Sequence, residues 1–258
     1  MRFDPENEEQ LLARINGATD LTLNNELGMA LAELAQLREH KQRKQEAEEL
    51  YLRSIKAFVS GGNDQNAIKT YLIFSGLLGR EDRHTDVVAY MTAALALAVK
   101  HQQTMDEAII LGQIAVAYMH LGDLENADRA FSRAVPLFDR NKAHGFTASL
   151  TSQAIAVFGP LFTAKSPDVI ARWLVFGMKS VMALKDKNAI DALSFAYFQL
   201  YTCRDLETKQ RLVRIWSNAR IGDFRTHILD RFKGMENGIT FKQRSRSFLR
   251  RLRDFLPW

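Results

Sequence analysis

The stretch LGQIAVAYMHLGDLENADRAFSRAVPLFD, residues 111–139, decides the fold. In its first half, apolar residues recur at spacings of three and four, which places them on one face of a helix: Leu111, Ile114, Ala115 and Tyr118. Gly122 can adopt the left-handed conformation that ends a helix, and Asp123 can cap the next one. The second half again has one apolar face, with Ala127, Phe131 and Ala134. The stretch therefore predicts a helical hairpin.

This order of small and large residues recurs at intervals of 40 residues on the N-terminal side. The aligned triplets are Leu31, Tyr71 and Leu111; Leu34, Phe74 and Ile114; Ala35, Ser75 and Ala115; Ala47, Val87 and Ala127; Tyr51, Met91 and Phe131; and Ser54, Ala94 and Ala134. Repetition at both helices of each pair indicates one structural unit used three times. Each unit cannot bury its apolar face alone, so stacking of the hairpins is expected.

The third hairpin resembles a tetratricopeptide repeat (TPR). That family places large, Leu, small and aromatic residues in its first helix, Gly-Asp at the turn, and Ala-x3-Phe-x2-Ala in its second helix. The matching residues here are Leu111, Ile114, Ala115, Tyr118, Gly122, Asp123, Ala127, Phe131 and Ala134. The two earlier hairpins depart from the pattern: Arg38 stands at the aromatic position of the first, and both have altered turns. The family's usual period is about 34 residues, so the longer period implies longer helices or loops.

The resemblance implies an all-α, right-handed solenoid of about five antiparallel helical hairpins. We expect three regions along the chain: an N-terminal helix or cap over 1–23, repeats over 24–218 that are clearest over 28–139, and C-terminal helices over 219–258. Beyond residue 139 the pattern weakens, but Ser166-Pro167-Asp168 is a strong helix start, and a further helix is expected from Asp223.

Composition supports helices and limits the functional classes. Of 258 residues 47% are hydrophobic, with 14 Gly and 5 Pro, which favours helices over strands. We expect no membrane span and no secretion signal, and the single cysteine, Cys203, fits a reducing cytosol. The net charge of +5 is uneven, because residues 209–258 hold 13 Lys or Arg and only 4 Asp or Glu. The basic character therefore belongs to the C-terminal fifth.

No motif in the sequence indicates catalysis. The six histidines have no paired spacing on one helix, and no Gly-rich phosphate loop follows a strand. Acidic pairs such as Glu48-Glu49 are typical of a solvated face or a helix cap. We therefore expect a non-enzymatic protein without a metal, cofactor or catalytic residue.

The TPR alignment implies a concave wall formed by the first helix of each hairpin. The residues predicted to bind a partner there are Lys69, Leu72, Gly76, Ile109, Gly112, Val116 and Met119, with Met29, Ala32, Gln36, Glu39, Gly79 and His120 also on the wall. The family's clamp for chaperone C-terminal carboxylates requires Lys, Asn and Arg. Those positions hold Ala32, Gln36, Gly76, Ile109 and Gln113, so this clamp is not expected. A small, apolar wall would suit an apolar or amphipathic partner segment, unless neighbouring hairpins or the chain's own end bury it.

The C-terminal stretch FKQRSRSFLRRLRDFLPW, residues 241–258, has the pattern of a basic amphipathic helix. Its candidate binding residues are Lys242, Arg244, Arg246, Phe248, Arg250, Arg251, Arg253, Phe255 and Trp258. It could bind an anionic membrane surface, an acidic protein or nucleic acid, or it could simply cap the repeats. Nucleic acid is the weakest alternative, because the aromatic residues lie on the apolar side and not among the arginines.

These observations lead to one expected function and two alternatives. The expected function is a cytoplasmic protein–protein interaction adaptor or regulator that binds a partner segment in the repeat groove. The first alternative is a peripheral membrane scaffold anchored by the basic C-terminal helix. The second is a dedicated, secretion-type chaperone that protects an apolar segment of its partner.

Overall fold

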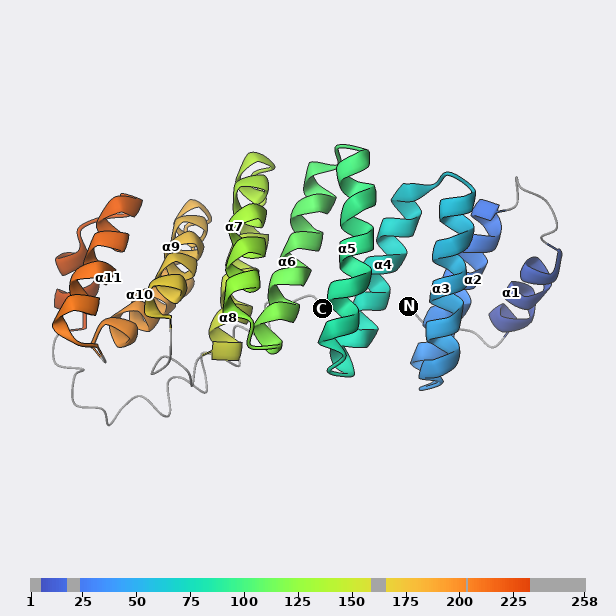
Figure 1. The fold of residues 1–258 in the computed structure, drawn as a ribbon, viewed down its shortest axis with the longest axis horizontal. Coiled ribbons are helices and arrows are strands. Elements are labelled where there is room, and N and C mark those ends of the chain that lie inside the picture. Colours follow the sequence, from blue (N-terminus) through green and yellow to red (C-terminus); the bar gives the residue numbers. More distant parts are fainter. Residues whose placement is uncertain (1–5, 18–23, 159–165, 203, 233–258) are drawn as a thin grey trace. The chain divides into compact units, whose positions relative to one another are not determined.

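The computed structural model describes residues 6–17, 24–158, 166–202 and 204–232 (Figure 1). These residues are helical throughout, with short turns and no strand. The helices are α1 (Glu6–Gly17), α2 (Asn24–His40), α3 (Lys44–Ser60), α4 (Asp64–Arg80), α5 (His84–Lys100), α6 (Thr104–His120), α7 (Leu124–Arg140), α8 (His144–Phe158), α9 (Pro167–Ala183), α10 (Lys187–Thr202), α11 (Leu206–Ala219) and the π-helical segment η3 (Arg225–Asp230).

Seven successive helices, α2 to α8, begin at intervals of 20 residues, and α2 to α7 are each 17 residues long. Two such helices make one hairpin, which accounts for the 40-residue period of the sequence. The predicted helical hairpins are therefore confirmed, and the period exceeds that of the resembled family because the helices are long. The predicted helix after Asp223 is present as η3.

The turns between these helices share one backbone geometry. In each, a residue with positive φ follows the helix: Gln42, Gly62, Asp82, Gln102, Gly122 and Lys142. The next N–H bonds back to a carbonyl five residues earlier, as from Asn63 to Phe58 at 2.8 Å and from Asp123 to Tyr118 at 2.9 Å. This is the Schellman arrangement, which satisfies the last carbonyls of the helix. Identical turns keep each helix antiparallel to the one before it.

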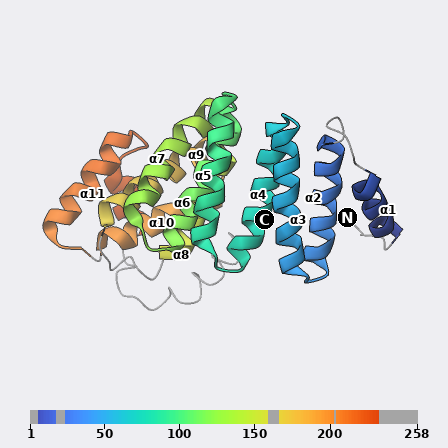
Figure 2. The same cartoon turned by 45° about the vertical axis from the view of Figure 1, so that its right-hand side comes forward.

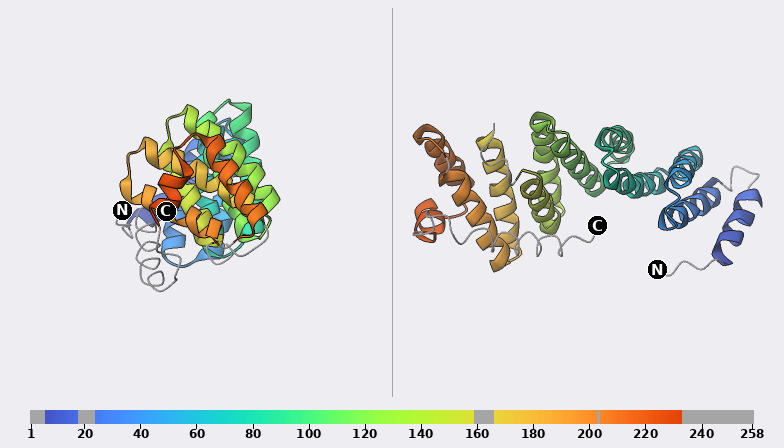
Figure 3. Two further views of the ribbon diagram at one scale, coloured as in Figure 1. Left: turned by 90° about the vertical axis from the view of Figure 1, so that its left-hand side faces the viewer. Right: turned by 90° about the horizontal axis from the view of Figure 1, so that it is seen from below.

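The chain divides into two compact units, Met1–Ala117 and Tyr118–Trp258, with the boundary inside α6. In the first unit each helix from α1 to α5 packs against the next, the nearest-neighbour packing typical of a solenoid (Figure 2). Viewed along the helices, α2 and α4 lie on one side of this unit and α3 and α5 on the other (Figure 3). The repeated small and large residues form its core, including Ala47, Tyr51 and Met91, each with no exposed surface.

Close helix packing in the first unit depends on one glycine. A Cβ added at Gly28 of α2 would stand 2.8 Å from the ring of Phe58 in α3. The buried hydroxyl of Ser54 donates to the carbonyl of Gly28 at 2.7 Å. The helices α2 and α3 can therefore approach closely only because position 28 has no side chain.

The second unit has a larger aromatic core. Tyr197 and Trp216 pack edge to face with ring centroids 5.0 Å apart, and Phe224 packs against both. The Tyr197 hydroxyl donates to the carbonyl of Leu212 at 2.7 Å, so this buried phenol is satisfied. Between α8 and α9, a Cβ on Gly177 would stand 2.5 Å from Thr151, which again marks a close helix contact.

The predicted all-α class with consecutive helical hairpins is confirmed. No helix among the described residues has the length and apolar character needed to cross a membrane. The predicted basic amphipathic helix, residues 241–258, lies outside the described residues, as does Cys203.

Candidate interaction surface

The outer side of α4 carries three of the predicted groove residues. Lys69 is exposed, and Leu72 and Gly76 are partly exposed one turn apart along the same face. Ile109 and Val116 of α6 are also partly exposed. These five predicted residues are therefore accessible at least in part.

Two predicted groove residues are buried. Gly112 is buried and Met119 has only 1% of its surface exposed. Gly112 and Met119 lie three or four positions from Ala108 or Ala115, neither of which has any exposed surface. The four residues therefore share one buried face of α6. A helix that is apolar on all sides gives no periodicity from which the open side can be predicted. Gly112 and Met119 are therefore not accessible to a partner.

Two glycines on α4 have open space where a side chain would be. A Cβ added at Gly79 would meet no heavy atom within 4 Å. At Gly76 the nearest atom is Nη1 of Arg80 at 3.4 Å, the far end of a flexible side chain. Unlike Gly28, neither glycine is needed for packing within the protein. The backbone of α4 is open to a partner along this side.

Exposed apolar side chains also lie on α2 and α4. Ile73 of α4 is 42% exposed and Met29 of α2 is 45% exposed. The sequence analysis did not single out Ile73, whose aligned positions in the other hairpins hold the polar residues Glu33 and Gln113. The feature of the sequence that could have identified Ile73 is a large β-branched residue at a position that is polar in the other two hairpins.

Charged side chains join α2 to α4 at the C-terminal end of this surface. Arg80 of α4 pairs with Glu39 of α2. Glu39 also accepts a hydrogen bond from the Tyr51 hydroxyl of α3 at 2.8 Å. Burial, followed by the negative charge of Glu39, raises the pKa of Tyr51 well above its usual value. The tyrosine thus remains a neutral donor that holds Glu39 in place.

We define the α2/α4 surface as the outer sides of these two helices, lined by Met29, Glu33, Gln36, Lys69, Leu72, Ile73, Gly76 and Gly79. It combines apolar side chains, open backbone and both signs of charge. Among the described residues there is no group of His, Cys, Asp and Glu that could hold a metal ion. The surface can bury apolar groups and offers charged partners at its margins.

Comparison with known proteins gives a fold relationship and no family. No family model matches the chain, and no curated protein matches it. Among solved structures, the crystal structure of BtubC (BKLC) from P. vanneervenii is similar, with a TM-score of 0.55 and 16% sequence identity. The likeness covers 92% of this chain and 94% of that chain. At this identity the likeness concerns the fold alone, and the chain is a helical-repeat protein.

Proposed function

We propose that this protein is a non-enzymatic adaptor or regulator that binds a segment of another protein on the α2/α4 surface. The observation that carries the proposal is a pair of glycines on α4: Gly79 faces open space, and at Gly76 only the flexible end of Arg80 stands within 4 Å of an added Cβ. Helical-repeat proteins commonly bind partners along extended surfaces of this kind.

The glycines are unfavourable for the helix itself. Glycine inside a helix destabilises it by about 1 kcal/mol relative to alanine. At Gly76 and Gly79 this cost is not offset by close packing within the protein, because a Cβ would fit at both positions. An approaching partner backbone would use the space, as in other close backbone contacts at glycine.

The neighbouring residues favour an amphipathic partner segment. Ile73 and Met29 offer apolar area, and a flexible methionine adapts to different side chains. Lys69 on the same face of α4 is exposed, which suits an acidic residue at the edge of the bound segment. This is the helix-in-groove mode, in which apolar anchors bury and charged residues set orientation.

We further propose that the repeats are of the TPR type. The residues that carry the resemblance occupy the expected environments in α7: Ala127, Phe131 and Ala134 have no exposed surface. The turn before them has Gly122 in the left-handed conformation, and the Asp123 side chain accepts from the N–H of Asn126 at 3.1 Å.

The experiment compares affinity purifications with three forms of the full chain. Gly76→Arg fills the open space on α4 with a long charged side chain. Ala93→Arg is the matched control, because Ala93 is exposed on α5 of the same unit. Circular dichroism and thermal unfolding establish that all three are folded, and quantitative mass spectrometry identifies the proteins that bind each.

The expected result is a protein retained by the wild type and by Ala93→Arg and lost with Gly76→Arg. Crosslinking that captured protein to α4 would then define its bound segment. If folded Gly76→Arg retains the same proteins in the same amounts as the wild type, the α2/α4 surface is not the binding site and the proposal fails.

A further inference from the structure

The second unit carries positive charges that the proposed partner surface does not use. We propose that one edge of this unit binds the surface of an anionic phospholipid membrane. The proposal stands on the described residues alone and does not involve residues 241–258.

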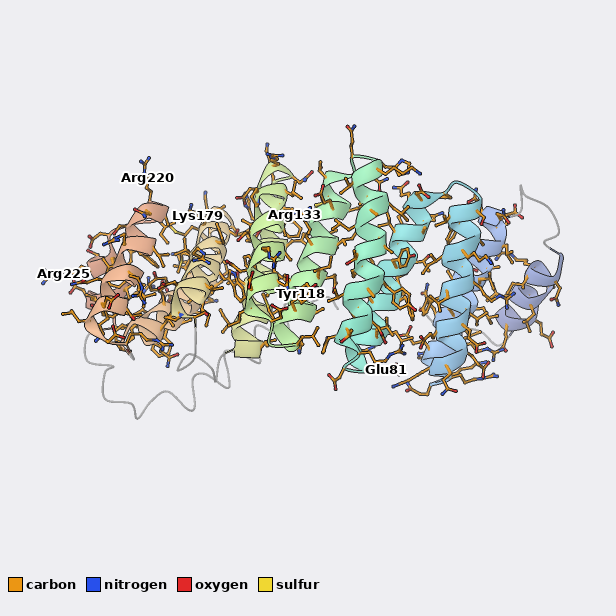
Figure 4. All side chains as sticks on the ribbon, in the orientation of Figure 1. Glu81, Tyr118, Arg133, Lys179, Arg220 and Arg225 are labelled. Atoms are coloured by element: carbon orange, nitrogen blue, oxygen red, sulfur yellow. The ribbon has the colours of Figure 1, made fainter. Side chains whose placement is uncertain are left out.

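Three helices of the unit end at the same edge. Oδ2 of Asp128, early in α7, lies 2.6 Å from Nη2 of Arg172, early in α9. Oδ2 of Asp168, at the start of α9, lies 3.1 Å from Nε of Arg211 in α11. These pairs join residues in the first two turns of the helices, and Figure 4 shows α7, α9 and α11 running side by side, so their C-terminal ends lie at one edge. Figure 4 shows Lys179 and Arg220 at this end of α9 and α11.

Each of these three ends is followed by a cation in the left-handed conformation. Lys142, Lys185 and Arg220 follow α7, α9 and α11 with φ of 55°, 57° and 55°. This is the left-handed position that glycine fills best, and Gly62 and Gly122 hold it elsewhere in the chain. Among the described residues with positive φ, these three are the only Lys or Arg. Three turn positions that disfavour any residue with a Cβ thus hold positively charged residues at one edge of the unit.

Further exposed cations extend this set. We define the basic edge as Arg140, Lys142, Lys179, Lys185, Lys187 and Arg220, all exposed. The helix dipole explains a cation in the last turn of a helix, such as Arg140. It does not explain Lys187, which is the first residue of α10 and stands where the dipole disfavours positive charge.

The acidic residues near the basic edge are engaged in other contacts. Asp186 accepts from the N–H of Ala189 at 3.0 Å, and Asp223 accepts from the N–H of Thr226 at 2.8 Å. Asp139 lies 3.7 Å from Nδ1 of His144. The carboxylates therefore cap helices or face a histidine.

An apolar tip at the centre of the edge favours a membrane over an acidic polypeptide. Leu184 is 51% exposed and Met182 is 38% exposed, and they lie beside Lys179, Lys185 and Lys187 in sequence. Apolar side chains surrounded by lysines can enter the boundary between headgroups and acyl chains while the ammonium groups meet anionic lipids. An acidic polypeptide would need the charges but would not need the exposed leucine.

The test measures binding of the full chain to vesicles of phosphatidylcholine with or without phosphatidylserine. The triple variant Lys142→Gly, Lys185→Gly and Arg220→Gly removes three charges and places the preferred residue at each turn, so it should fold. Three exposed cations of the first unit, outside the α2/α4 surface, provide a control matched in charge: Lys44→Gln, Arg53→Gln and Lys56→Gln. Both triple variants are also made with Arg250→Gln, Arg251→Gln and Arg253→Gln, so that binding by the C-terminal segment cannot hide the effect.

We expect the glycine triple variant to bind phosphatidylserine vesicles on the order of 100-fold more weakly, since each basic residue near the surface contributes about fivefold. The control triple variant should change binding far less. Binding should weaken as salt rises, because salt screens charges beyond a Debye length of about 10 Å at 0.1 M. Equal binding by wild type and the glycine triple variant, in both backgrounds, would overturn the proposal.

Leu184→Gln separates the two kinds of partner. It should weaken binding to phosphatidylserine vesicles and leave binding to poly-glutamate unchanged. If it has no effect on vesicles while poly-glutamate competes with them, the basic edge is a site for acidic protein and the membrane assignment is wrong.

Discussion

Nε2 of His101 lies 2.6 Å from Oδ2 of Asp64, and this contact joins the C-cap of α5 to the first residue of α4. Lys100 donates to the same oxygen at 3.0 Å. The Asp64 carboxyl is buried, and the hydrogen bonds from His101 and then from Lys100 hold its pKa below its usual value. Two side chains at the end of one helix thus hold the start of its antiparallel neighbour.

This contact predicts an acid-dependent stability. The folded pKa of Asp64 is lower than the unfolded pKa of about 3.9, so the native state binds fewer protons. Its stabilisation is therefore complete above about pH 4 and is lost as pH falls through the lower, folded pKa. Asp64→Asn should lower the free energy of unfolding at pH 7 by about 1–2 kcal/mol. Urea unfolding across the acidic range should show this difference shrinking; a difference independent of pH would contradict the assignment.

The open glycines of α4 predict stabilising substitutions. Gly79→Ala should raise the free energy of unfolding by about 0.5–1 kcal/mol, because alanine is the better helix former and its Cβ meets no atom within 4 Å. Gly76→Ala should act in the same direction. Thermal or urea unfolding measures the change, and purification of the proposed partner shows whether the more stable proteins bind less.

The packed glycines are the control for this prediction. Gly28→Ala and Gly177→Ala should each destabilise by about 1–3 kcal/mol, because a Cβ would stand 2.8 Å from Phe58 and 2.5 Å from Thr151. If all four substitutions had effects of the same sign, the distinction between open and packed glycines would be lost.

The repeated turns predict a second class of stabilising changes. Gln42 and Gln102 have φ of 62° and 54°, which is unfavourable for a residue with a Cβ. Gln42→Gly and Gln102→Gly should each stabilise the protein by up to about 1 kcal/mol. Gly122→Ala, at the same position of another turn, should destabilise by a similar amount. A shift of the unfolding midpoint in the opposite direction would refute the shared turn geometry.

Asp128 predicts a stability difference between two substitutions. Its carboxylate accepts from Nε1 of Trp173 at 2.8 Å and pairs with Arg172. Asp128→Ala removes the acceptor of a buried indole and should cost about 1–3 kcal/mol. Asp128→Asn retains an acceptor oxygen and should cost less. Urea unfolding, followed by tryptophan fluorescence, orders the two; equal losses would show that the Trp173 hydrogen bond is not the stabilising contact.

Periodicity was sufficient to predict the hairpins and their interval. Residues such as Tyr51, Met91 and Phe131 are buried at equivalent places because each repeat meets the same neighbours on both sides. The turns were only partly predictable. Gly62 and Gly122 predict a left-handed residue in their turns, because glycine favours that conformation. Gln42 and Gln102 do not predict it, and they adopt it because the packing of the two flanking helices requires the same turn. Tertiary packing overrides local preference there.

The accessible surface was harder to predict than the core. Between residues 108 and 119 of α6 nearly every position is apolar, so no periodic signal separates the buried Gly112 and Met119 from the more open Val116. In α4 the repeat alignment places Ile73 level with Glu33 and Gln113, but it could not show that Ile73 is exposed one turn from Gly76. Alignment gives equivalent positions along a helix, and accessibility depends on what packs against each one.

Sequence by itself determined that this chain folds into helical hairpins with a 40-residue period, because apolar spacing along a helix is a local property. Only the tertiary structure decided which residues remain open and which charges gather. Lys142, Lys185 and Arg220 are far apart in sequence and belong to one edge because α7, α9 and α11 run in the same direction. Residues so distant in sequence become neighbours through the packing of whole helices, and no single stretch of sequence predicts that packing.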